Sequence, residues 1–266
     1  MDTLPAVRRL LTRLFPPACA GCDGHAPPGS AFCNLCRPLA PLLEPPSCTI
    51  CRIPMTTHAD DRVAPSICSR CRRDPPGFQQ VSACWEYDDA VADALRRVKY
   101  GEDFAALRAL CRGARPWFET QLAELPPSAP LIPVPAHRIE LRRRGFHVPT
   151  LALRLLLTRQ NGARIRPRLA KIRQTPRQAG LSVPERRKNV RGVFRDTGDE
   201  PTKPTAVIFD DVMTTGTTAD EAASALLDAG FETVRVLVLA RAPRARDFRS
   251  PGPSKTPRRQ PGPAPA

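Results

Sequence analysis

Eight cysteines among the first 71 residues form four pairs, each with two residues between its members. The gaps between successive pairs are 10, 11 and 16 residues. A C-x-x-C pair lets two thiolates of one turn reach the same ion, and tetrahedral zinc takes four such donors at ~2.3 Å. The spacing therefore predicts two structural zinc sites of four cysteines each, built from Cys19, Cys22, Cys33, Cys36, Cys48, Cys51, Cys68 and Cys71.

The sequence favours sequential pairing of these cysteines, with the first four at one ion and the last four at the other, but leaves interleaved pairing open. A disulfide scaffold requires an oxidising compartment. Pro5, Arg8 and Arg9 interrupt any apolar signal at the N-terminus, so we expect a cytoplasmic protein. An iron–sulfur cluster is a second alternative, but two regular ribbon-like halves favour zinc. Cys84 and Cys111 stand outside the pairs and are expected to be buried apolar side chains.

A second pattern lies near the C-terminus, where the apolar run 205–209 ends in two adjacent acids, Asp210 and Asp211. The loop that follows contains small and hydroxyl residues and leads into a predicted helix: Thr214, Thr215, Gly216, Thr217 and Thr218. Backbone N–H groups at a helix N-terminus favour a phosphate. Two carboxylates would repel a bare polyanion, but they suit sugar hydroxyls or the water shell of a divalent cation.

Strands and helices must alternate to position these residues. Strand-like runs are expected at 81–87, 131–134, 205–209 and 234–240, with a weaker pair at 168–172 and 192–195. Helical patterns include 103–111, 149–159 and 218–228. A strand, a helix and a strand over 205–240 form a βαβ unit, so we expect an α/β fold with a mostly parallel sheet.

Three regions differ in composition. We expect residues 1–77 to hold an N-terminal helix and the cysteine module, and the turn-rich Asp74-Pro75-Pro76-Gly77 to mark their boundary with a main domain at 78–243. Residues 244–266 are rich in Pro and Arg, and we expect a disordered tail. No apolar run reaches the ~18 residues of a membrane span.

Positive charge is concentrated in one segment of the 266-residue chain. The whole chain has 41 Lys+Arg against 26 Asp+Glu, a formal charge of +15. Residues 137–195 contain 17 Lys+Arg and two acids, which gives 17 − 2 = +15, so the remainder balances at 24 against 24. Such a field favours a polyanion, either a nucleic acid or a polyphosphorylated small molecule. An Arg-rich composition that decorates solvated faces is the simpler alternative.

The run from Val207 to Thr218 resembles the phosphoribosyl pyrophosphate (PRPP) signature of type I phosphoribosyltransferases. With the cysteine module, the chain over about residues 10–241 resembles the ComF family of competence-associated phosphoribosyltransferase-like proteins. Further matching segments are Lys99-Tyr100-Gly101, Arg144-Gly145-Phe146 and a Q-x-x-L-x-x-x-x-R-x-x-N arrangement from Gln178 to Asn189. His147 stands where the family usually has Asn.

The resemblance implies a type I phosphoribosyltransferase-like sheet that binds PRPP with Mg²⁺. Asp210 and Asp211 would hold the ribose hydroxyls, directly or through Mg²⁺, and the loop from Thr214 to Thr218 would bind the 5′-phosphate. Arg144, Gln178 and Arg186 would belong to the pyrophosphate side or to the flexible loop over PRPP. The reaction would transfer phosphoribosyl to a nitrogen acceptor, with no catalytic base identified. Purine-salvage members carry an acid where this chain has Thr214, so a purine acceptor is disfavoured.

A non-catalytic competence factor is the alternative function. The family association with transformation suggests a role near single-stranded DNA or a helicase-type partner. Base stacking would require aromatic residues among the arginines, and the segment 137–195 offers only Phe146 and Phe194. The intact acid pair favours the PRPP hypothesis, because two carboxylates do not serve a nucleic-acid binder.

Overall fold

The computed structural model describes residues 16–22, 24–55, 66–157, 164–173, 192–198 and 204–243. The predicted N-terminal helix, the tail 244–266 and two expected loop residues, Gln178 and Arg186, lie outside the described residues. Among the helices of the described part, none combines the length and apolar composition that a membrane crossing requires.

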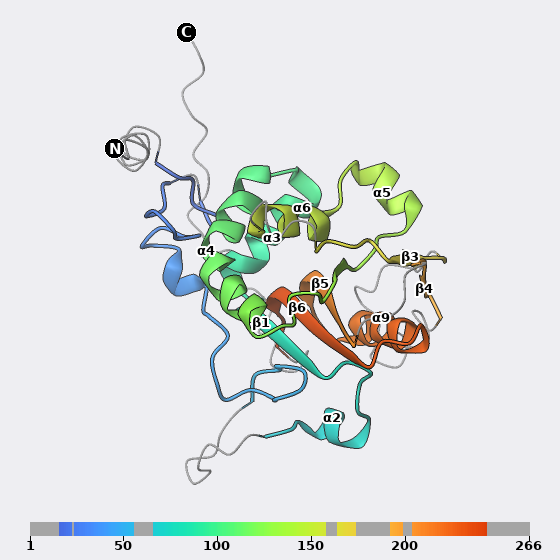
Figure 1. Cartoon of the computed structure of the whole chain (residues 1–266). Helices are drawn as coiled ribbons and strands as arrows, with labels where there is room; N and C mark the ends of the chain where they lie inside the picture. Colours follow the sequence, from blue (N-terminus) through green and yellow to red (C-terminus); the bar gives the residue numbers. More distant parts are fainter. Residues whose placement is uncertain are drawn as a thin grey trace, which may run out of the picture.

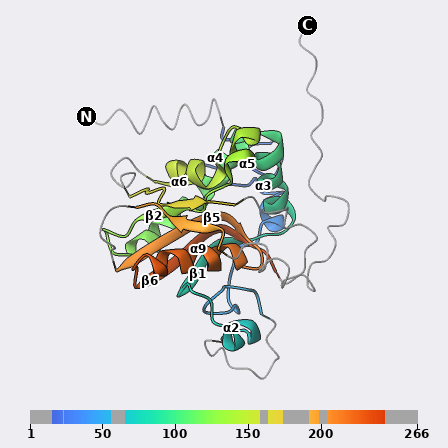
Figure 2. The same ribbon diagram turned by 90° about the vertical axis from the view of Figure 1, so that its right-hand side faces the viewer.

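A parallel sheet of four strands forms the centre of the molecule (Figure 1), in the order β1-β6-β5-β2; Figure 2 labels all four. These strands are β1 (Gln80–Glu86), β6 (Thr233–Arg241), β5 (Thr205–Met213) and β2 (Leu131–Pro133). β5 pairs with a neighbour on each side, and Ile208 lies in register with Val236 on β6 and with Ile132 on β2. The predicted α/β fold with a mostly parallel sheet is confirmed.

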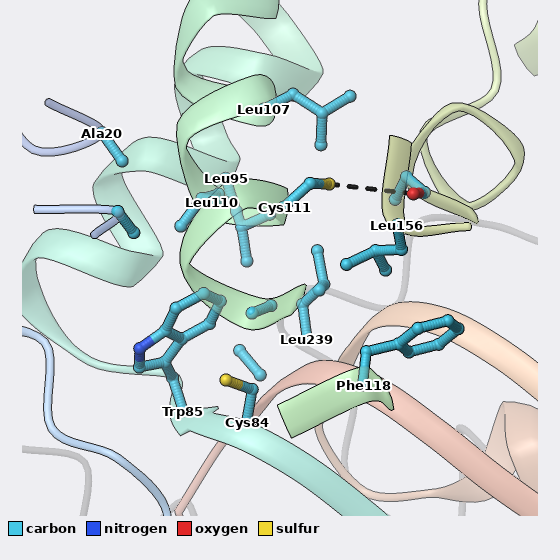
Figure 3. Close-up of a cluster of buried hydrophobic side chains, with 14 of the residues drawn as sticks. Ala20, Cys84, Trp85, Leu95, Leu107, Leu110, Cys111, Phe118, Leu156 and Leu239 are labelled. Atoms are coloured by element: carbon cyan, nitrogen blue, oxygen red, sulfur yellow. Dashed lines mark hydrogen bonds between the residues drawn. The ribbon is translucent and has the colours of Figure 1, made fainter. Parts of the chain in front are cut away.

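One face of the sheet is covered by α3 (Asp89–Gly101), α4 (Phe104–Ala123) and α6 (Val148–Leu156), which lie above it in Figures 1 and 2. Their apolar side chains pack with Trp85 of β1 and Leu239 of β6 (Figure 3). Cys84 and Cys111 are buried in this cluster, as predicted, and the Cys111 thiol contacts the Ala152 carbonyl.

Helix α4 is longer than the predicted segment 103–111, because its buried residues continue at helical spacing through Ala114, Phe118 and Leu122. Pro116 lies inside the helix, so tertiary packing overrides the usual helix-breaking effect of proline. Gly113 allows the N-terminal cysteine segment to approach this helix, since a Cβ there would lie 2.7 Å from the Ala31 backbone nitrogen.

The opposite face of the sheet packs against α9 (Thr217–Asp228) and against the short antiparallel pair β3 (Leu169–Lys171) and β4 (Phe194–Asp196). The short helix α2 (Ser69–Arg73) lies at the far end of this side in both views (Figures 1 and 2). The predicted weak strand pair is therefore present. A 3-10 turn, η1 (Arg37–Leu39), follows the first cysteine pairs.

Helix α5 (Arg138–Arg144), like the short helix α2, has no counterpart among the predicted elements. Its sequence RIELRRR lacks an apolar face, and the helix buries no residue. His137 caps its N-terminus by accepting from the backbone N–H of Ile139, and the Glu140 carboxylate accepts from the backbone N–H of His137. Local capping rather than burial therefore forms this helix.

Candidate functional site

The eight paired cysteines gather into two groups of four. Within each group the four sulfur atoms lie within 4.8 Å of one another. The first group is Cys19, Cys22, Cys33 and Cys36, and the second is Cys48, Cys51, Cys68 and Cys71. This grouping is the sequential pairing that the sequence favoured. His25 is exposed and belongs to neither group.

Backbone N–H groups point at the sulfur atoms, as a thiolate metal site requires. Cys19 Sγ accepts from the N–H of Gly21 at 3.3 Å and of Cys33 at 3.2 Å. Cys48 Sγ accepts from the Cys68 N–H at 3.3 Å. Burial raises the pKa of the Cys68 thiol, but the backbone N–H at Cys71 and neighbouring thiols outweigh it and bring that pKa to about 7. Both groups therefore fit tetrahedral zinc.

Successive strand residues alternate, so Asp210 and Asp211 leave β5 toward opposite faces, but their carboxyl groups remain close enough to hydrogen-bond each other. Asp211 is 4% exposed and faces α3, where the Lys99 ammonium lies 2.7 Å from its Oδ2 atom. Burial raises the pKa of Asp211, but the Lys99 charge outweighs burial and holds this pKa below its ordinary value. Burial and the Asp211 charge raise the pKa of Asp210 well above its ordinary value. The acid pair therefore has one firmly ionised and one readily protonated carboxyl.

Asp210 lines a cavity of about 100 Å³ between the end of β5 and the start of α9. The other lining residues are Val212, Met213, Thr214, Thr215, Gly216, Thr218, Ala219 and Val238. Pockets that enclose a whole drug-sized ligand measure ~300–1,000 Å³. The cavity is thus suited to one group of a larger ligand, and the start of α9 offers that group a positive dipole end.

Gly216 begins α9 in a conformation that other residues rarely adopt, with φ of 80°. A Cβ at this position would lie 2.4 Å from the Met213 Cε atom. Because a glycine has no side chain, it leaves the first N–H groups of α9 without an Asp, Asn, Ser or Thr cap at that position. The Thr215 hydroxyl lies 2.8 Å from the Thr217 hydroxyl and also accepts from the Thr217 N–H at 3.4 Å.

His147, the N-cap of α6, lies on the face of the sheet toward which Asp211 points. Its ring bonds the Val134 backbone and the Thr150 hydroxyl, with 2.7 Å between His147 Nδ1 and Thr150 Oγ1. Burial lowers the pKa of His147, and Arg144 lowers it further, while the Val134 bond and the Asp211 charge act in the opposite direction. The structure thus brings His147 near Asp211, and Arg144 near His147.

The guanidinium groups of two arginines donate to backbone carbonyls of the loop. Arg241 is 1% exposed and donates to the Met213 carbonyl at 3.0 Å and to the Thr214 carbonyl. Arg70, between two cysteines of the second group, donates to the Thr215 carbonyl. The loop therefore contacts the second cysteine group through side chains.

The sequence singled out the acids, the loop and Arg144. Asp211, Thr217 and Arg144 do not line the cavity, whereas the other predicted residues do: Asp210, Thr214, Thr215, Gly216 and Thr218. The sequence did not predict the contacts of three residues. Lys99 had only a place in a family motif, His147 was noted as a departure from the family, and Arg241 had no role. A charged residue directly after the apolar run 234–240 is the one signal that could have marked Arg241. The Lys99–Asp211 contact joins residues 112 positions apart (211 − 99), which spacing does not predict.

A parallel α/β domain with a small-residue loop at the end of a central strand, joined to two four-cysteine groups that fit zinc ribbons, defines the class of this protein. No protein-family model matches the sequence.

The chain is similar to curated proteins of bacteria. DNA utilization protein YhgH of Salmonella typhi is 30% identical over 179 residues, which cover 65% of this chain and 77% of that protein. Competence protein F of Haemophilus influenzae is 28% identical over 182 residues, 66% of this chain and 78% of that protein. YhgH of Escherichia coli K12 is 27% identical over 228 residues, 79% and 96% of the two chains. The chain belongs to the ComF family, as the sequence patterns suggested.

Zinc content tests the two four-cysteine groups separately. The purified wild-type protein is expected to carry two zinc ions per chain, and Cys48→Ser one, because three thiolates hold zinc less tightly than four. Cys22→Ser, in the other group, should lose the other ion. Replacing Cys84, which lies outside both groups, with Ala serves as the control and should leave two ions. Mass-spectrometric metal analysis that finds iron, or two zinc ions in Cys48→Ser, would contradict the assignment.

His147 makes stability depend on pH. Its pKa is lowered in the folded state, so the unfolded chain binds the proton more readily, and stability falls as pH drops below the ordinary value of 6.5. The groups facing the ring are Asp211, Arg144 and the Val134 carbonyl. His147→Asn should flatten the slope of unfolding free energy between about pH 7.5 and about pH 5.5 in urea titrations. The exposed His25→Asn variant should keep the wild-type slope, and an unchanged slope in His147→Asn would refute this reading.

Proposed function

We propose that this protein binds PRPP with Mg²⁺ at the end of β5 and transfers its phosphoribosyl group to a nitrogen acceptor. The observation that carries the proposal is the cavity lined by Asp210 together with Thr214, Thr215 and Thr218. One acid and one phosphate-type loop thus meet at the start of a helix. Those are the groups that a phosphorylated ribose needs, since hydroxyls bind carboxylates and a 5′-phosphate binds helix N–H groups.

The two carboxylates would have different roles in ligand binding. Asp210 borders the cavity and offers the oxygen ligands that Mg²⁺ prefers. Asp211 is ionised and paired with Lys99, so it would hold that ammonium in place beside the ribose site. Ligand binding would favour the ionised form of Asp210, whose pKa is raised, so affinity should increase with pH.

In the proposed reaction the bond between C1′ and the pyrophosphate oxygen breaks, and the electron pair leaves with pyrophosphate. A bond between C1′ and the acceptor nitrogen forms, and that nitrogen gives up a proton to solvent. Mg²⁺, when bound, would neutralise charge on the departing pyrophosphate. Arg144 is half-buried near His147 and would add positive charge there.

Relatives named for competence and for DNA utilization support a role in DNA uptake or use. The α5 surface adds a reason to consider nucleic acid as the alternative ligand, because Arg138, Arg142 and Arg143 are exposed there. Single-stranded DNA or a helicase-type partner would bind such a surface without the acid pair. The proposed cytoplasmic location suits both functions.

Calorimetric titration with PRPP, with and without Mg²⁺, tests the proposal. Wild type is expected to bind in a Mg²⁺-dependent way, and Asp210→Asn to bind at least about 10-fold more weakly, because a charged hydrogen-bond partner is lost. The Lys99–Asp211 pair stays intact in this variant, so its fold should persist.

Asp228→Asn, at the far end of α9 from the cavity, is the matched control and should bind like wild type. Zinc-loaded wild type that binds no PRPP, but binds single-stranded DNA through α5, would replace the proposal with the nucleic-acid alternative.

A further inference from the structure

Arg241 is a buried cation that joins the second cysteine group to the loop beside the cavity. Its guanidinium donates to the Cys51 carbonyl at 2.8 Å, to the Met213 carbonyl at 3.0 Å and to the Ala242 carbonyl at 2.7 Å. It also donates to the Thr214 carbonyl. The side chain is 1% exposed, so these carbonyls replace water around the charge.

Arg70 supplies a second connection from the same cysteine group. It lies on α2 between Cys68 and Cys71, and its guanidinium donates to the Thr215 carbonyl. Three successive loop carbonyls, from Met213 to Thr215, are therefore bound by two guanidinium groups. Arg70 lies between two cysteines of the second group, and Arg241 donates to the backbone carbonyl of Cys51 in the same group.

This arrangement fixes the direction of the loop N–H groups. In a trans peptide the C=O of one residue and the N–H of the next point in opposite directions. Because the carbonyls of residues 213–215 face the two guanidinium groups, the N–H groups of residues 214–216 point away from them. Thr214, Thr215 and Gly216 also line the cavity, where a phosphate would accept from such N–H groups.

The second group also supplies charge that Arg241 needs. Among the ion pairs of the described residues, none joins a carboxylate to Arg241. The Cys51 and Cys68 sulfur atoms would act favourably on its guanidinium when they are ionised as metal ligands. A zinc ion with four thiolates has a net charge of 2 − 4 = −2, so a loaded site would balance the buried cation.

We propose that the second four-cysteine site, when it holds zinc, positions the phosphate-binding loop through Arg241 and Arg70. Both arginines act as positioning residues, since they hold the loop carbonyls and not the ligand. Loss of zinc from this site would release the loop, whereas loss from the first site would not. The phosphate-binding role of the loop rests on the proposed function, but the mechanical link between metal and loop does not.

Amide hydrogen exchange of the ligand-free protein tests the link. Arg70→Met is expected to speed exchange across residues 213–217 at least about 10-fold, because it removes a carbonyl bond from a loop that opens locally. Arg70→Lys keeps a cationic donor and should restore part of the protection. Arg73→Met, an exposed arginine on the same helix, is the matched control and should exchange like wild type.

Arg241→Met and Cys48→Ser should each produce a larger effect than Arg70→Met, and Cys22→Ser in the first group should leave the loop protected. Zinc content is measured on every sample. Unchanged loop exchange in Arg70→Met would overturn the proposal even if the deeper variants unfold. Equal effects of the two cysteine variants would overturn it as well.

PRPP titration of the same variants separates this inference from the proposed function. If both hold, Arg70→Met loosens the loop and weakens PRPP binding about 10-fold while its zinc content stays at the wild-type value. If wild type binds no PRPP but Arg70→Met still loosens the loop, the proposed function fails and the link stands. If PRPP binds equally well to wild type and Arg70→Met and the loop exchange is unchanged, the link alone fails.

Discussion

The structure depends on how it accommodates two adjacent carboxylates at the end of a strand that is buried between two neighbours. Asp210 and Asp211 cannot both hold a full charge there at no cost, because a buried ion without a partner is strongly unfavourable. Lys99 of α3, on the face of the sheet toward which Asp211 points, neutralises Asp211, while the pKa of Asp210 rises. The pair thus leaves one carboxyl, at the cavity, whose charge a ligand or cation can stabilise.

Arginine provides the connections between the cysteine groups and the α/β domain on both faces of the sheet. Arg97 of α3 donates to the Ala20 carbonyl, and Arg112 of α4 donates to the Ser30 carbonyl at 2.9 Å, so the first group holds the helices over the sheet. Arg70 and Arg241 do the same between the second group and the loop. The two groups are thereby distinguished: one holds the helices that position Lys99, and the other holds the loop.

The sequence predicted those parts of the site that follow from local pattern. Cysteine spacing, the βαβ period and the acid pair with its threonine loop each depend on residues that are close in the chain, and each appears in the structure. Helix α5 was missed because it is formed by capping and lacks an apolar face, and the end of α4 was missed because packing outweighs Pro116. The contacts of Lys99, His147 and Arg241 were missed because they join distant segments, for which a single sequence carries no spacing signal.

A crystal structure of the zinc-loaded protein grown with PRPP and Mg²⁺ tests the central claim most directly, namely that the end of β5 is a phosphoribosyl site. We expect the 5′-phosphate in the cavity at the start of α9, within hydrogen-bond distance of the loop from Thr214 to Thr218, and the ribose hydroxyls toward Asp210. PRPP bound instead along the arginines of α5, with the cavity at the end of β5 holding only solvent, would contradict it.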